Sequence, residues 1–154
     1  MSKKRAFVQA TNDEVGQARM QLIKKALDKI EAAKNQGFYL EAIAILESLI
    51  ADRLESLISI VDKETGFQTL GNSIKKLKGI GSKFDKNFMK FIKKELNSWR
   101  DNRNKALHEM VKLEANNLHE WETRYAKLEE EIGKGYKIFR RIDKEITIQR
   151  KKLK

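Results

Sequence analysis

An arginine, an asparagine and a histidine lie close together in the segment Arg103-Asn104-Lys105-Ala106-Leu107-His108. Histidine ordinarily titrates near neutral pH, so it can both accept and donate a proton. The planar guanidinium of an arginine can hold two oxygens of one phosphate. These residue types suit the cleavage of RNA by its own 2′-hydroxyl, in which His108 moves protons and Arg103 stabilises the crowded phosphate without a metal ion. Asn104 is predicted to orient Arg103 or the substrate.

The same segment is predicted to open a helix. Asp101 or Asn102 can cap it, because their side chains accept hydrogen bonds from the free N–H groups of a first helical turn. A helix N-terminus also binds anions through those N–H groups and its positive dipole. Five helical residues turn through about 500°, so the Cα atoms of Arg103 and His108 are expected to lie about 140° apart. A long arginine side chain is still expected to reach the same cleft.

This segment resembles the motif of the HEPN superfamily, an arginine followed about four to six residues later by a histidine. Arg103, Asn104 and His108 match its Arg-Asn-x-x-x-His form. The resemblance implies a bundle of about four to five helices. It also implies a metal-independent endoribonuclease with these three residues as its catalytic residues. A homodimer is implied as well, with the two motifs facing each other in one composite active site.

The resemblance places the chain among toxin–antitoxin, abortive-infection and other antiviral-defence proteins, with an antitoxin or regulatory protein as a further partner. One subset of the family has a tyrosine two positions after the histidine, where this chain has Met110. Control through modification of that tyrosine is therefore not predicted. Many HEPN domains bind or scaffold without cutting, so a non-catalytic relative is the alternative.

Lysine and arginine are concentrated in residues 73–105, which contain eleven of them against three aspartates and glutamates. Such a cluster favours contact with phosphates. The predicted RNA-binding residues are Lys86, Lys90, Lys93, Lys94, Arg100 and Lys105. The alternative is an ordinary solvated helix surface. Phe88 or Trp99 could stack on a base, but their spacing favours a place in the core.

The elements that must position these residues are predicted to be helical throughout, giving an all-α fold. The chain has 154 residues, of which 40% are hydrophobic and 36% charged, with eight glycines and no proline. A β-sandwich or β-barrel needs frequent turns, so this small number of turn-forming residues disfavours both folds. A first helix is predicted from a cap at Asn12 or Asp13 to Gly37, and a second, the most buried, over residues 38–61. Residues 62–81 are expected to form a loop with at most one short helical stretch.

A third helix is predicted from Ser82, with Asp85 completing a capping box. Its inner stripe consists of Phe84, Phe88, Phe91, Ile92, Leu96 and Trp99. A long helix from Arg103 follows, and heptad steps run from Leu118 to Leu153, with Gly135 and Gln149 in two apolar slots. The interpretation is an intramolecular helical hairpin bent at Gly133-Lys134-Gly135. A coiled coil with a partner is the alternative.

Residues 1–154 are predicted to form one domain, with 136–154 as its basic C-terminal segment. The net charge of +11 favours polyanionic partners, RNA first. The absence of cysteine and the presence of only two histidines predict no metal and no cofactor. No signal segment or membrane span is visible, so a cytoplasmic protein without membrane contact is expected.

The second functional hypothesis is a non-catalytic helical protein that binds nucleic acid, or an acidic protein partner, through residues 73–105 and the basic C-terminal helix. A third is a helix at 136–154 that lies on a membrane surface. The apolar residues of that segment fit the helical hairpin better.

Overall fold

The computed structural model describes residues 14–62, 66–113, 115 and 120–153. The elements in these ranges are α1 (Glu14–Asn35), α2 (Tyr39–Val61), α3 (Leu70–Gly79), the 3-10 turn η1 (Gly81–Lys83), α4 (Lys86–Phe91), the π-helical segment η2 (Ile92–Leu96), α5 (Asn97–His108) and α6 (Trp121–Lys152). The described part of the chain contains no strand. The all-α prediction is confirmed.

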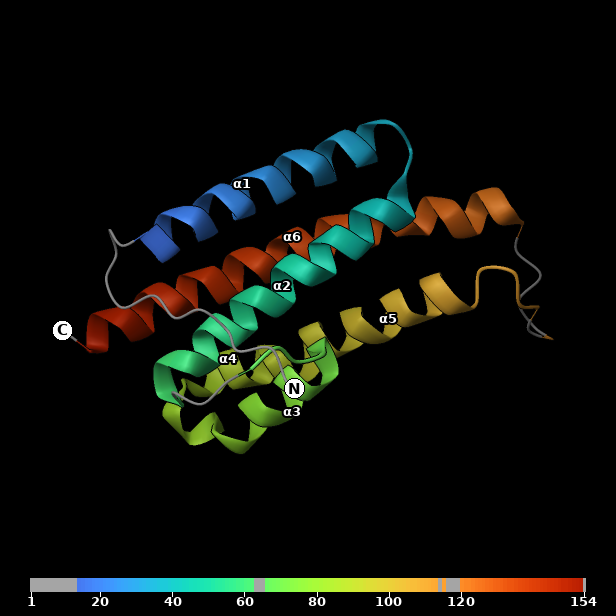
Figure 1. Cartoon of the computed structure of the whole chain (residues 1–154). Coiled ribbons are helices and arrows are strands. Elements are labelled where there is room, and N and C mark those ends of the chain that lie inside the picture. Colours follow the sequence, from blue (N-terminus) through green and yellow to red (C-terminus); the bar gives the residue numbers. More distant parts are fainter. Residues whose placement is uncertain (1–13, 63–65, 114, 116–119, 154) are drawn as a thin grey trace.

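Three long helices, α1, α2 and α6, lie side by side, and α1 runs opposite to the other two (Figure 1). The most extensive packing joins α2 to α6, and the next joins α2 to α1. α3 and α4 gather at the end of α2 that is remote from α1's last turn (Figure 1). α2 buries eleven of its 23 residues, which confirms residues 38–61 as the most buried helix.

The turn between α1 and α2 depends on Gly37, whose φ is +78°. This left-handed conformation is one that glycine adopts without steric cost. The N–H of Gly37 donates to Lys34 O at 3.0 Å and that of Phe38 donates to Ala33 O at 2.8 Å, the pattern that closes a helix C-terminus. The predicted end of the first helix is confirmed, whereas its predicted caps, Asn12 and Asp13, lie outside the described residues.

The predicted loop over residues 62–81 contains a ten-residue helix, α3. Its N-cap is Thr69, whose hydroxyl accepts a hydrogen bond from Asn72 N at 3.2 Å. Ile74 and Leu77, around which a short helical stretch was expected, are buried in the core. The helix is therefore present, and it is longer than the glycine content of this region indicated.

The next helix begins later than predicted. The Asp85 carboxylate accepts hydrogen bonds from Asn87 N at 2.8 Å and Phe88 N at 3.4 Å, so Asp85 is the cap and Lys86 the first helical residue. Ser82 lies in η1 and caps nothing. The predicted inner stripe is confirmed, because all of its members are buried: Phe84, Phe88, Phe91, Ile92, Leu96 and Trp99.

The predicted hairpin at Gly133–Gly135 is wrong, because α6 is one continuous helix of 32 residues. Gly135 is buried where α6 crosses α2, and a Cβ at this position would lie 2.4 Å from Leu46 Cδ2. Glycine here permits close helix packing rather than a bend. Most of the heptad positions are buried, including Gln149, but Trp121 and Leu153 are exposed, and Leu118 lies outside the described residues.

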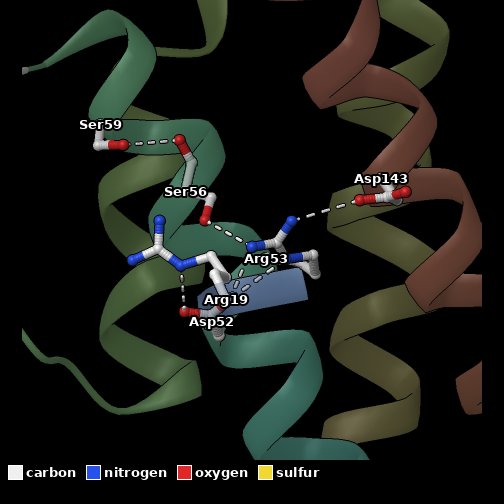
Figure 2. A network of polar contacts seen from close by, with 6 residues as sticks. All are labelled: Arg19, Asp52, Arg53, Ser56, Ser59 and Asp143. Carbon is white, nitrogen blue, oxygen red and sulfur yellow. Dashed lines mark hydrogen bonds and ion pairs between the residues drawn. The ribbon is translucent and has the colours of Figure 1, made fainter. Parts of the chain in front are cut away.

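A polar network links the three long helices (Figure 2). Arg53 of α2 is only 5% exposed, and its guanidinium donates to Asp52 Oδ2 at 2.8 Å, to Ser56 Oγ at 3.1 Å and to Asp143 Oδ1 of α6 at 3.4 Å. Arg19 of α1 lies 3.7 Å from Asp52. Because every nitrogen of the buried Arg53 guanidinium has an acceptor, this cluster fixes how the helices pack and offers no open site.

Candidate nucleic-acid interface

The structure turns Arg103 towards the interior of the bundle. Its guanidinium forms an ion pair with Glu47 of α2, and only 11% of its side chain is exposed. Of its nitrogens, Nη2 donates to Glu47, and Nε is buried and has no partner among the described residues. A carboxylate that already occupies the guanidinium competes directly with a phosphate for the same donors. In this arrangement the charge of Arg103 is used within the protein.

His108 is the last residue of α5, and its side chain is exposed. The chain then turns under Arg124 of α6, whose Nη1 donates to Lys112 O at 2.6 Å and to Met110 O at 3.3 Å. The end of a helix at which carbonyl groups gather carries partial negative charge. This end of α5 therefore offers a phosphate no free helix N–H groups, and its carbonyl groups are turned to Arg124 instead.

The prediction that a helix starts at Arg103 is wrong, and the reason lies in the supposed caps. Asp101 pairs with Arg100 at 2.9 Å, and Asn102 Nδ2 donates to Glu131 of α6 at 3.3 Å. Neither side chain turns back to cap a helix start. The inner stripe simply continues past Trp99 to the half-buried Arg103 and Ala106, so the helix continues as well.

Within one chain, therefore, Arg103, Asn104 and His108 do not form a shared cleft. Arg103 contacts α2, Asn104 is half-buried, and His108 is exposed about 140° further around the helix. The helix N-terminus that was expected to hold the phosphate is not at this place, because α5 ends at His108. The composite active site that the family resemblance implies would need the motif of a second subunit as well.

Four of the six predicted RNA-binding residues do come together. Lys86, Lys90, Lys93 and Lys94 line a surface hollow of about 570 Å³, and Lys78 of α3 lines it with them. The buried Phe84 and Met89 form the apolar part of the lining, beside Gly81 and Ser82. We call this site the lysine hollow, defined by Lys78, Lys86, Lys90, Lys93 and Lys94.

The charge of the lysine hollow is uncompensated. None of its five lysines has an ion-pair partner among the described residues, whereas the neighbouring Lys76 pairs with Asp62 at 3.0 Å. Between residues 78 and 94 the acidic residue is Asp85, whose carboxylate is already used as a helix cap. Five like charges around one depression produce a field that attracts polyanions.

The other two predicted RNA-binding residues lie elsewhere. Arg100 is paired with Asp101 on its own helix, so its charge is partly neutralised. Lys105 lines a separate cavity of about 440 Å³ between α5 and α6. That cavity carries both signs of charge: Glu109, Glu130 and Glu131 lie beside Lys105, Lys112, Arg124, Lys127 and Lys134. Lys134 donates to Glu131 at 2.7 Å, and this hydrogen bond raises the pKa of Lys134.

Lys78 is the member of the lysine hollow that sequence reasoning missed. It belongs to a different helix, α3, and nothing in its spacing relates it to the lysines of α4 and η2. Phe88 and Trp99, the two aromatic residues considered for base stacking, are each only 1% exposed and belong to the core as their spacing indicated. The lysine hollow therefore has positive side chains but neither of these aromatic rings is available to stack on a base.

Among the described residues, no three histidine, aspartate or glutamate side chains lie close enough together to hold a metal ion. The helices in the described ranges lack the combination of length and apolar composition that crossing a membrane requires. The second histidine of the chain, His119, lies outside the described residues. No family model, no curated protein and no solved structure matches this chain.

Proposed function

We propose that this protein binds nucleic acid through the phosphate backbone, at the lysine hollow. The observation that carries the proposal is the convergence of five unpaired lysines from α3, α4 and η2 around one depression. Lysine ammonium groups are flexible point charges that suit phosphate oxygens. Backbone phosphates are common to all sequences, so the binding is expected to be largely independent of base sequence.

Binding of this kind releases counterions, so it must weaken steeply with salt. For a single strand, the logarithm of the affinity falls with the logarithm of salt concentration with a slope of about −0.7 for each phosphate contacted. Because the aromatic residues of α4 are buried, base stacking contributes little at the hollow. RNA and DNA strands are accordingly expected to bind with similar affinity.

Reversing two charges of the hollow tests the proposal. The double variant Lys90→Glu/Lys94→Glu is expected to weaken binding of a fluorescein-labelled RNA of about 20 nucleotides at least about tenfold, and to reduce the salt slope by about 1.4, because two phosphate contacts are lost. Fluorescence anisotropy across a salt series measures both quantities. Both side chains are exposed, so the fold should be unaffected.

A matched control separates a local site from general attraction. Lys24→Glu/Lys25→Glu makes the same change in net charge on the exposed surface of α1. This control is expected to retain nearly the affinity and salt slope of the unsubstituted protein. Equal losses in the two double variants would show that net charge alone attracts the RNA, and the hollow would then not be the site.

The HEPN-type endoribonuclease, with its composite site in a homodimer, stays a prediction. It requires a second subunit to face His108 and a phosphate to displace Glu47 from Arg103. The proposed binding function predicts that the unsubstituted protein and His108→Ala leave labelled RNA intact in EDTA, as measured by gel electrophoresis. Fragments ending in 2′,3′-cyclic phosphate that appear with the unsubstituted protein and disappear with His108→Ala would instead establish the nuclease.

A further inference from the structure

The C-terminal half of α6 presents a second basic surface. Six of its cationic side chains are exposed and lie within an arc of about 120° on an ideal helix. They are Lys137, Arg140, Arg141, Lys144, Lys151 and Lys152. At about 1.5 Å per residue they extend over about 22 Å. We call this row the α6 stripe.

The two acidic residues of this stretch do not neutralise the α6 stripe. Asp143 is turned towards α2 and pairs there with Arg53 at 3.4 Å. Glu145 is buried and accepts a hydrogen bond from Gln149 at 2.8 Å. None of the six cations of the stripe has an acidic partner among the described residues. The α6 stripe, like the lysine hollow, therefore carries only positive charge.

The α6 stripe contacts α4 at Arg141. Its guanidinium lies over the ring of Phe91, 5.9 Å from the ring centroid, so α6 touches α4 at this point. Phe91 directly follows Lys90 at the end of α4, and Lys93 and Lys94 follow it in η2. Arg141 thus places one cation of the stripe against α4, the helix that carries Lys86 and Lys90. Glu95, exposed on η2, is the one acidic side chain of residues 86–96.

We propose, on the basis of the nucleic-acid binding proposed above, that one strand runs continuously from the lysine hollow across Arg141 and along the α6 stripe. The ligand is then a nucleic-acid chain rather than a mononucleotide or a very short oligonucleotide. At the rise of a strand in a duplex, about 3.4 Å per nucleotide, the stripe alone corresponds to about six nucleotides. A strand long enough to reach from the hollow onto the stripe gains the phosphate contacts of both surfaces, whereas a shorter one gains those of only one.

An anionic membrane would also be attracted to such a stripe, but the apolar residues favour nucleic acid. A helix that lies in a membrane interface buries one apolar face in the lipid. In α6 those residues are committed to the core, since Ile138, Phe139, Ile142 and Ile146 are all buried. Within the stripe itself, Ile148 is only 38% exposed.

The test compares two RNA lengths with the full chain. Arg140→Glu/Lys144→Glu is expected to weaken binding of a labelled RNA of about 20 nucleotides at least about tenfold and to weaken binding of an RNA of about five nucleotides, measured at low salt, much less, because the short RNA can still bind the hollow. Lys90→Glu/Lys94→Glu is expected to weaken both. The neutral variant Arg140→Gln/Lys144→Gln should show a smaller loss for the long RNA, and circular dichroism checks that each variant is folded.

The outcomes separate the two proposals. If the α6 variant binds both RNA lengths as the unsubstituted protein does while the hollow variant is impaired, the continuous track is wrong and the hollow remains. If neither variant changes binding, nucleic-acid binding at the hollow is itself wrong. If the α6 variant loses binding to vesicles of phosphatidylserine and phosphatidylcholine but keeps its affinity for the long RNA, the stripe is a membrane-binding surface instead.

Discussion

Trp99→Ala is expected to lower the free energy of unfolding by about 3–5 kcal/mol. The indole is 1% exposed, and its Nε1–H donates to the backbone oxygen of Glu131 at 2.8 Å. One side chain therefore contributes both core volume and a hydrogen bond that ties α5 to α6. Urea unfolding followed by circular dichroism measures the loss without depending on the fluorescence of the residue removed.

Trp99→Phe is the matched control. It keeps an apolar ring in the core and loses mainly the hydrogen bond and part of the volume, so a loss of about 1–2 kcal/mol is expected. A change of less than about 1 kcal/mol in Trp99→Ala would contradict the placement of this ring in the core. Because α5 follows directly from η2, the alanine variant is also expected to loosen the lysine hollow and to weaken RNA binding.

Gly135→Ala is expected to lower the free energy of unfolding by about 1–2 kcal/mol. The new Cβ would lie 2.4 Å from Leu46 Cδ2 and 3.1 Å from Trp99 Cζ2, and both of these side chains are buried. Overpacking of a core typically costs about 1–3 kcal/mol, and a 2.4 Å contact belongs to the upper part of that range, so the cost exceeds the gain of about 1 kcal/mol from replacing a helical glycine with alanine. Thermal and urea unfolding measure the net effect.

Gly133→Ala provides the contrast within the same helix. No atom lies within 4 Å of the Cβ position at Gly133, so here the helix propensity gain of up to about 1 kcal/mol is expected to appear alone. Combining Gly135→Ala with Leu46→Ala should cost less than the sum of the two single changes, since the shorter side chain makes room. Stabilisation by Gly135→Ala would instead indicate that α2 and α6 are less closely packed.

The helical elements were largely predictable because their signal is local. Apolar residues that recur every three or four positions mark a buried stripe whatever the rest of the fold is. Phe88, Ile92 and Leu96 were assigned to the core on this ground, and all three are buried. The exact starts were less predictable: Ser82 and Asp85 both have capping side chains, and only the backbone geometry shows that Asp85 is the cap.

The motif of Arg103 and His108 shows that the spacing of two residues in the sequence does not reveal which side chains they contact. The sequence gives the separation of the two residues, but it does not show that Glu47, 56 positions earlier, occupies Arg103. Nor does it show that the helix ends at His108 under the guanidinium of Arg124. Both facts depend on which helices pack together, and both change what the two side chains can do chemically.

The composition and periodicity of this chain determined an all-α fold, the turn at Gly37 that follows α1 and the two regions rich in lysine and arginine. Tertiary packing decided that Gly135 joins two helices instead of bending one, that Arg103 is neutralised, and that Lys78 and Arg141 extend the basic surface of α4 and η2. The physical reason is the separation along the sequence of the residues that interact. Helix formation is governed by residues three or four positions apart, whereas a charge is compensated or reinforced by whatever side chains the packed helices bring within a few ångströms.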